Sequence, residues 1–155
     1  MDKLKIRRYK ASDNPIVWEL HWLGLSELGI EPIPGPLDHD FNNIEEIYLK
    51  NGDFLVGEID GKVIAMGAFK KINEEVAELK RMRVHPDFQG RGFGQAILEE
   101  LEKRVRKLGF KRMILDTSKG WFKAQKLYKK NGYIEIGRNN LSARYNAIFY
   151  EKQLS

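Results

Sequence analysis

Residues Gln89 to Gln95 have the composition and spacing of a phosphate-binding loop. They read Gln89-Gly90-Arg91-Gly92-Phe93-Gly94-Gln95, and an amphipathic helix follows directly. The first backbone N–H groups of a helix lack intrahelical acceptors, and the helix dipole places partial positive charge beside them. Glycine also lets the main chain approach an anion closely, because it has no Cβ. The segment therefore predicts an anion site whose donors are the amides of residues 89 to 95.

Two common phosphate-binding patterns do not fit this loop. The P-loop needs a lysine followed by serine or threonine after its last glycine, and Gly94 is followed by Gln95 and Ala96. The dinucleotide fingerprint G-x-G-x-x-G fails because Gln95 occupies the third glycine position. Arg91 could add a charge-assisted contact to the anion or could remain in solvent.

A strand and a helix must hold this loop in place. Residues 78–84 mix charged and apolar residues and predict a strand, which His85-Pro86 ends because a residue before proline avoids helical geometry. The helix after the loop carries one apolar stripe, and Gly109 stops it. The predicted inward positions are Leu79, Met82 and Val84 on the strand and Ile97, Leu101, Val105 and Leu108 on the helix.

The remaining chain predicts an α/β (α+β) fold of one domain over residues 1–155. Asp60-Gly61 indicates a hairpin between strands at 54–59 and 62–70, and Pro15 suits the first turn of a helix that Gly29 ends. Hairpins followed by strand–helix–strand crossovers favour a mixed central sheet flanked by helices. Further strands are expected at 4–7, 112–117, 133–136 and 145–152, helices at 43–50 and 120–130, and a proline-rich loop without regular helix at 31–40.

The composition excludes several classes of protein. The chain has 155 residues, of which 42% are apolar and 32% charged, as in a globular domain with a core. There is no cysteine, so disulfides and thiolate metal sites are excluded, and the three histidines do not form a metal-ligand set. No apolar run approaches eighteen residues and no signal-peptide pattern starts at Met1, so we expect no membrane span and a cytoplasmic location.

Charge is distributed unevenly along the chain. Residues 13–60 hold eleven acidic side chains and one lysine, whereas residues 61–155 hold 21 basic and 10 acidic side chains. The basic part contains the predicted phosphate loop, and the acidic part would suit a cationic amine. The same charges could equally be solvated faces of helices and loops. A basic excess also permits nucleic-acid binding, but no run of basic residues interleaved with aromatics supports it, so no nucleic-acid partner is expected.

The glycine loop matches the Q/R-x-x-G-x-G/A segment of the Gcn5-related N-acetyltransferases, the GNAT family. Residues Leu127-Tyr128-Lys129-Lys130-Asn131-Gly132-Tyr133 are similar to the family's L-Y-x-x-x-G-F/Y segment. The resemblance covers residues 54 to 138 well and the first fifty residues poorly. It implies a sheet in which two parallel strands splay apart, with acetyl-CoA wedged between them. These strands would end at Val84 and near Thr117.

The resemblance also implies the residues that bind the cosubstrate. The amides of Gln89, Gly90, Arg91, Gly92, Phe93, Gly94 and Gln95 would take the pyrophosphate. Met82 and Arg83 would offer main-chain pairing to the pantetheine arm, and the N–H of Val84 would polarise the thioester carbonyl. The family often has asparagine where this chain has Trp121, so that contact to the arm is in doubt.

Two side chains would carry proton transfer in a protein of this kind. Glu78 lies eleven residues before Gln89, the spacing of the glutamate base in the histone-acetylating members it resembles, although many members use a water chain instead. Glu78 could also hold the acceptor ammonium. Tyr128 matches the tyrosine beside the cofactor sulfur and would protonate the departing thiolate, unless it is only a core residue.

The prediction from the sequence is an acetyl-CoA-dependent N-acetyltransferase, an acyltransferase in which the amine attacks the thioester directly in a ternary complex. The acceptor would be a primary amine on a small molecule or peptide, and the proline-rich loop would shape its site. The alternative is a CoA-binding regulatory or interaction module without catalysis. GNAT-like domains are often dimers, so a homodimer is a further hypothesis.

Overall fold

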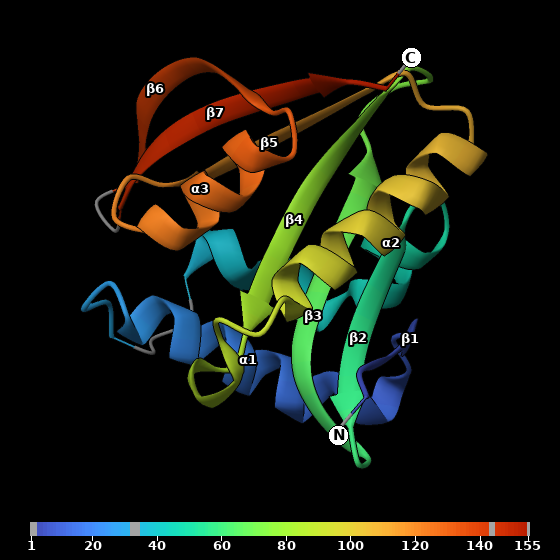
Figure 1. Cartoon of the computed structure of the whole chain (residues 1–155), viewed down its shortest axis with the longest axis vertical. Helices are drawn as coiled ribbons and strands as arrows, with labels where there is room; N and C mark the ends of the chain where they lie inside the picture. The colour runs from blue at the N-terminus through green and yellow to red at the C-terminus, as the bar shows by residue number, and fades with distance from the viewer. Residues whose placement is uncertain (1–2, 32–34, 143–144, 155) are drawn as a thin grey trace.

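The computed structural model describes residues 3–31, 35–142 and 145–154 and shows a seven-stranded sheet with helices on both faces (Figure 1). The strands are β1 (Lys5–Arg8), β2 (Asp53–Ile59), β3 (Lys62–Lys71), β4 (Val76–Val84), β5 (Arg112–Ser118), β6 (Ile134–Ser142) and β7 (Tyr145–Gln153). The α-helices are α1 (Asn14–Ser26), α2 (Phe93–Lys107) and α3 (Phe122–Lys130). Shorter helical turns are η1 (Ala11–Asp13), η2 (Pro36–Asn42), η3 (Glu45–Leu49) and η4 (Pro86–Phe88).

The sheet is mixed, as the sequence predicted. Its strand order is β1-β2-β3-β4-β5-β7-β6, and β4 and β5 are parallel while the other described neighbours are antiparallel. The predicted hairpin joins β2 to β3, with Asp60 and Gly61 both at positive φ. The crossover from β4 through α2 to β5 makes the one parallel pair of the described sheet, and the site lies beside that pair.

Two apolar layers hold the helices against opposite faces of the sheet. One layer packs α2 on the sheet, through residues such as Leu55, Ile97 and Leu101. The other packs α1, η2 and η3 on the far face, through Val17, Phe41 and Val56. Leu55 and Val56 are neighbours in β2 and serve different layers because successive strand side chains point to opposite faces. This sheet is therefore buried on both sides at β2 and β3.

Helix α2 follows the predicted stripe with one exception. Ile97, Leu101 and Val105 are fully buried, and Gly109 has φ of 89°, the left-handed conformation that ends many helices. Leu108, predicted as the last residue of the stripe, is 60% exposed. It caps the helix after the last turn, where the chain already turns away from the sheet.

The segment between α1 and β2 differs from the prediction. The proline-rich stretch was expected to lack regular helix, but Pro36 begins the 3₁₀ helix η2, where a missing N–H costs nothing. Pro32 and Pro34 lie outside the described residues. The helix expected at 43–50 is a π-helical turn, η3. Among the described residues, no helix combines the length and apolar character that crossing a bilayer requires.

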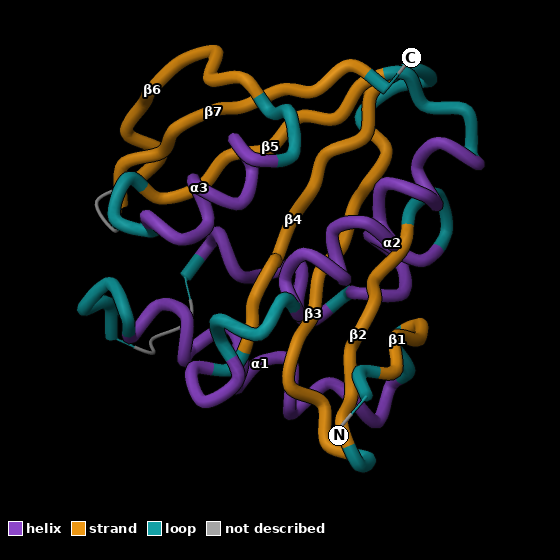
Figure 2. The backbone as a smooth tube through the Cα atoms, in the orientation of Figure 1, coloured by secondary structure: helices purple, strands orange, loops and turns teal. Residues whose placement is uncertain are grey.

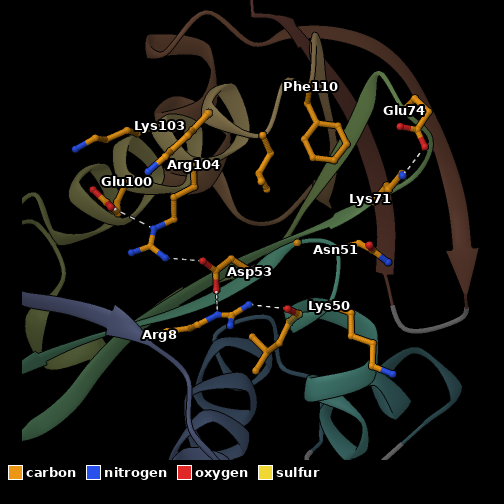
Figure 3. A pocket seen from close by; sticks show the side chains of 14 residues that line it. Arg8, Lys50, Asn51, Asp53, Lys71, Glu74, Glu100, Lys103, Arg104 and Phe110 are labelled. Carbon is orange, nitrogen blue, oxygen red and sulfur yellow. Dashed lines mark hydrogen bonds and ion pairs between the residues drawn. The ribbon is translucent and has the colours of Figure 1, made fainter.

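A hollow of about 730 Å³ lies between the C-terminal half of α2 and the start of β2, and Asp53 lines it between Arg8 and Arg104 (Figure 3). The Asp53 carboxylate accepts from Arg8 Nε at 2.8 Å and is also bonded to Arg104 of α2. Arg8 in turn donates to the Leu49 carbonyl. These charges join β1, β2, η3 and α2 at the edge of the molecule.

Candidate functional site

A cleft of about 560 Å³ opens where β4 and β5 separate. The two strands pair only from Val76 with Arg112 to Glu78 with Ile114. Both continue beyond that point, to Val84 and to Ser118, without pairing with each other. Figure 2 shows the strands close together near the C-terminus and diverging from there. The cleft reaches from the first turn of α2 through the gap to α1 and the start of α3.

The glycine loop forms one end of the cleft. Gly90 and Gly92 have φ of 78° and 84°, a region that other residues rarely adopt, and Gly92 leads directly into α2. The amides of Phe93, Gly94 and Gln95 fall in the first helical turn, where helix geometry offers no acceptor. All of these residues line the cleft. The loop thus places amides without intrahelical acceptors beside the cleft.

Side chains on either side of the loop fix its position. Gln89 donates to the Val84 carbonyl at 3.1 Å and, at 3.0 Å, to Glu27, the residue after α1. Gln95 exchanges two amide hydrogen bonds of 2.8 Å with Asn131, at the end of α3. The loop is therefore tied to β4, α1 and α3, which form the walls of the cleft.

Strand β4 gives the cleft an unpaired main-chain edge. On one side Arg83 pairs with Met66 of β3, and on the other side β5 has already diverged. Met82, Arg83 and Val84 all line the cleft. The side chains of Met82 and Val84 pack in the apolar layer under α2. No described strand covers β4 on the β5 side at residues 82–84, so an extended ligand could add there. The Met82 carbonyl accepts from the Arg83 side chain, and the Val84 carbonyl accepts from Gln89.

Tyr128 lies on the α3 side of the same cleft. It is 5% exposed, and its ring meets those of Tyr133 and Tyr150 at centroid distances of 5.7 and 6.3 Å. Burial raises the pKa of the Tyr128 phenol, and nearby Arg83 only partly opposes this. The phenol is therefore protonated at neutral pH and can act as a proton donor.

The α1 side of the cleft holds a buried polar network. His21 Nε2 is 2.7 Å from Asp38 Oδ1, and His21 Nδ1 is 3.3 Å from Arg83 Nη2. The pKa of His21 is lowered to about 3 by burial and by the charges of Arg83 and Arg81, so the ring is neutral. Since arginine can only donate, Nδ1 accepts from Arg83 and Nε2–H donates to Asp38.

A second buried group lies beside the first. Arg81 Nε donates to Asp40 Oδ2 at 2.9 Å, and the Tyr48 hydroxyl also donates to this carboxylate. Burial alone would raise the pKa of Asp40, but these hydrogen bonds and the Arg81 charge lower it. Arg81 has φ of 61° and lies over the Phe41 ring at 4.7 Å. Sequence reasoning did not find either network.

The sequence model of the acetyltransferase (GNAT) family matches residues 17–133. The chain belongs to the GNAT acetyltransferase family. That match includes the glycine loop, β4, and the Tyr128 segment, which are the parts that form the cleft. The recognition made from the sequence is confirmed.

Similar GNAT proteins agree in fold. A GNAT-family acetyltransferase from Staphylococcus aureus MU50 superimposes with a TM-score of 0.88 at 21% identity, covering 99% of this chain and 100% of that one. YncA of Salmonella typhimurium, described as a structure with its cofactor acetyl-CoA, gives 0.78 at 19% identity over 98% and 94% of the two chains. The predicted splayed fold is thereby confirmed.

The curated relatives match this chain over smaller shares of their own length. The amino-acid acetyltransferase of Azotobacter vinelandii is 31% identical over 106 residues, which are 66% of this chain and 23% of that protein. The uncharacterized N-acetyltransferase YjgM of Escherichia coli is 25% identical over 137 residues, 84% of this chain and 82% of that one. The chain thus spans less than a quarter of the first of these relatives and most of the second.

Not every predicted residue reaches the GNAT cleft. Glu78 is at the last position where β4 still pairs with β5, and its carboxylate is 3.7 Å from Lys70 Nζ of β3. It does not belong to the lining of the cleft. Arg91 lies over the Phe88 ring at 5.2 Å and donates to the Asp87 carbonyl, also outside the lining. The structure therefore brings together Tyr128, residues 82–84 and the other loop residues.

Trp121, which replaces the family's usual asparagine, has a different part in this GNAT protein. Its indole N–H donates to the Gly24 carbonyl of α1 at 3.3 Å, and the Arg83 guanidinium lies over its ring at 4.4 Å. Trp121 thus closes the cleft between α3 and α1. The aromatic ring makes a cation–π contact with this guanidinium, which an asparagine amide would not do.

The acidic segment does not line the cleft as expected. Asp13 and Glu58 pair with Arg7, Asp53 pairs with Arg8 and Arg104, and Asp40 pairs with Arg81. Among the described acidic residues of the segment 13–60, Glu27 alone lines the cleft, and it already accepts from Gln89. The electrostatic reason for a cationic acceptor is therefore absent in the described residues.

Proposed function

We propose that this GNAT protein transfers an acetyl group from acetyl-CoA to a primary amine of a small molecule or peptide. The observation that carries the proposal is the cleft itself, with amide donors at one end, an unpaired strand edge along it and a protonated tyrosine beside the gap. Relatives whose names include amino-acid acetyltransferase and N-acetylaspartate synthetase support an amine of small size.

The residues present fit acetyl-CoA. Amides of residues 89–95 would hold the pyrophosphate, and the main chain of residues 82–84 would pair with the pantetheine arm. Acetyl-CoA supplies an activated thioester. The Val84 N–H would stabilise negative charge on its carbonyl oxygen.

Transfer then needs one bond to form and one to break. In the ternary complex the amine nitrogen would attack the thioester carbon as the carbon–sulfur bond breaks. Tyr128 would donate its phenolic proton to the departing thiolate, and its phenolate would then regain a proton from water. The proton lost by the amine would pass to water, because the Glu78 carboxylate lies 3.7 Å from Lys70 Nζ and Glu78 is not among the described residues that line the cleft. Direct attack in a ternary complex requires no covalent enzyme intermediate.

Two glycines allow a matched test of the phosphate loop. Gly92 and Gly109 lie at opposite ends of α2, with φ of 84° and 89°, and an added Cβ would meet nothing within 4 Å at either. Gly92→Ala and Gly109→Ala should therefore lose similar stability, about 1 kcal/mol each. Calorimetry with CoA should show binding at least tenfold weaker for Gly92→Ala and unchanged for Gly109→Ala. Equal affinities would contradict the loop assignment.

Catalysis is tested by release of free CoA thiol. Purified protein with acetyl-CoA and a panel of amines, amino acids and short peptides should release thiol in an amine-dependent way. Binding of CoA without any such release would favour a regulatory CoA-binding module. Failure to bind CoA would overturn the proposed function altogether.

A further inference from the structure

We propose that Arg83 binds a carboxylate of the acceptor, so that the amine substrate is an amino acid or a similar amino-carboxylic acid. The inference rests on the proposed function and names its substrate class. It comes from the α1 side of the cleft, where a guanidinium is held in a built pocket.

The side chain of Arg83 points away from the phosphate loop. Neighbouring Met82 and Val84 pack under α2, so Arg83 projects from the opposite face of β4, toward α1. The loop that would bind pyrophosphate sits at the first turn of α2. A CoA phosphate is accordingly not the group that Arg83 would meet, and the group on its side of the cleft is the acceptor.

Three contacts hold the guanidinium in one orientation. Nη1 donates to the Met82 carbonyl at 2.8 Å, Nη2 donates to His21 Nδ1 at 3.3 Å, and the plane lies over the Trp121 ring at 4.4 Å. Neutral His21 is itself fixed by Asp38. An arginine held in this way has lost its rotamer freedom before any ligand binds, which favours affinity.

Helix α1 makes room for this arginine. A Cβ at Gly24 would lie 2.7 Å from Arg83 Cδ and 2.8 Å from Nε. Glycine within a helix costs about 1 kcal/mol relative to alanine, so this position sacrifices helix stability to let the side chain pass. Gly24 also accepts from Trp121, and both residues line the cleft. The pocket is therefore shaped around Arg83.

The charge of the cleft is suited to an anion. Five cationic side chains and two carboxylates line it: Lys80, Arg81, Arg83, Lys123 and Lys130, with Glu27 and Asp116. Buried Asp38 faces His21, and Asp40 is bonded to Arg81 and Tyr48. A guanidinium in such surroundings is matched to a carboxylate by its charge, and its bonds to Met82 and His21 hold it in place.

The decisive measurement compares amino acids with their carboxamides as acceptors. The amide has the same side chain and amine but no negative charge. Its amine is also less basic and more often deprotonated, so the comparison is biased against the proposal. Wild-type protein should nevertheless show kcat/KM at least about tenfold higher for the acid than for the amide, the value of one charge-assisted hydrogen bond.

Two variants locate this selectivity at Arg83. Arg83→Gln should lower the acid-to-amide ratio by about 10- to 150-fold, because hydrogen bonds to charged groups are worth about that much. Gly24→Ala keeps the charge, restores a good helix former and displaces the arginine, so it should lower the ratio in the same direction. Arg138→Gln removes an exposed arginine paired with Glu135 on β6 and should leave the ratio unchanged.

The outcomes separate this inference from the proposed function. Amine-dependent thiol release with equal use of acids and amides, or a ratio unaffected by Arg83→Gln, would overturn the carboxylate site and leave the transferase intact. Loss of CoA binding in the wild type would overturn the transferase itself. If CoA binds but no acceptor reacts, calorimetry of amino acids against the CoA complex decides. The proposal is then refuted if amino acids do not bind the wild-type CoA complex, or if they bind the Arg83→Gln complex equally well.

Discussion

Replacing Tyr128 with phenylalanine removes the proposed proton donor and keeps the aromatic packing of the fold. The aromatic contacts of Tyr128 with Tyr133 and Tyr150 involve ring atoms that phenylalanine retains. General-acid catalysis contributes about 10²- to 10⁴-fold in rate, so kcat should fall by at least about 100-fold. The Kd for CoA should change by no more than about threefold, because the loop and strand edge are untouched.

Neighbouring Tyr133 provides the matched control. It is also buried, but its hydroxyl donates to Glu102 Oε2 at 2.7 Å, below α2 and away from the cleft. Hydrogen bonds to charged groups contribute about 1.5 to 3 kcal/mol, so Tyr133→Phe should lower the free energy of unfolding by that amount. It should leave kcat nearly unchanged. The two variants are thus expected to show opposite signatures in a urea titration and in a steady-state assay.

The pH dependence gives an independent check on Tyr128. In the proposed role the active form is the protonated phenol, so the contribution of Tyr128 to kcat would be lost as pH rises through its pKa. Burial raises that pKa above the ordinary value of about 10, which moves the loss to higher pH. Wild-type kcat should therefore show no decline due to Tyr128 below about pH 10. A decline near pH 8 that Tyr128→Phe removes, or equal losses of kcat and CoA affinity in that variant, would refute the assignment.

Three further substitutions, one of them with a matched control, test other parts of the structure. Glu78→Gln should leave the pH–rate profile for a good acceptor unchanged, because Glu78 pairs with Lys70 outside the cleft. If the variant instead lost the acidic limb of the profile, Glu78 would be the general base after all. Gly67→Ala should lower the free energy of unfolding, measured by urea titration, by about 1 to 3 kcal/mol, because the new Cβ would lie 2.5 Å from Met82 Sδ. A free energy of unfolding within about 0.5 kcal/mol of the wild-type value, on the order of experimental scatter, would contradict this packing. Asp53→Asn should lower the free energy of unfolding by about 1 to 2 kcal/mol, a value discounted because Arg8 and Arg104 are partly exposed. The control Lys50→Gln breaks an exposed pair with Glu46 and should hardly change the free energy of unfolding. Equal effects of the two variants would argue against a structural role for Asp53.

Local patterns in the sequence identified the parts of the site that depend on local structure. The hairpin at Asp60-Gly61, the start of α1 at Pro15 and the glycine loop before α2 each follow from the conformational preferences of a few adjacent residues. The loop also predicts its own function, because glycines and a helix N-terminus suffice to create amide donors. The parts that were predicted well therefore needed no information about distant residues.

The buried networks could not be predicted in the same way. Arg81 and Asp40 are 41 residues apart, and Arg83 and His21 are 62 apart. No spacing rule links such positions, so the acidic segment could be interpreted as an acceptor site or as solvated faces. In the structure Asp13, Asp40 and Asp53 form ion pairs. The position of Glu78 depended likewise on where β4 and β5 stop pairing, which the sequences of the two strands do not reveal.

One feature of β4 was nevertheless visible in the sequence and explains the two arginines. The inward residues Leu79 and Met82 are three apart, whereas an uninterrupted strand repeats every two residues. The structure resolves this interval as a bulge. Met66 pairs with Arg83 and Ala68 with Lys80, so Gly67 alone faces Arg81 and Met82. Arg81 takes up the extra residue at φ of 61°, a conformation that costs about 1 kcal/mol outside glycine.

The bulge reverses which side chains face α1. Without it, Met82 and Val84 would follow Glu78 and Lys80 on the α1 face, and both arginines would be forced into the apolar layer under α2. With it, Met82 and Val84 enter that layer, while Arg81 reaches Asp40 and Arg83 reaches His21. The ion pair with Asp40 offsets the strain at Arg81. The bulge thus delivers to the α1 side the guanidinium that we propose selects the acceptor.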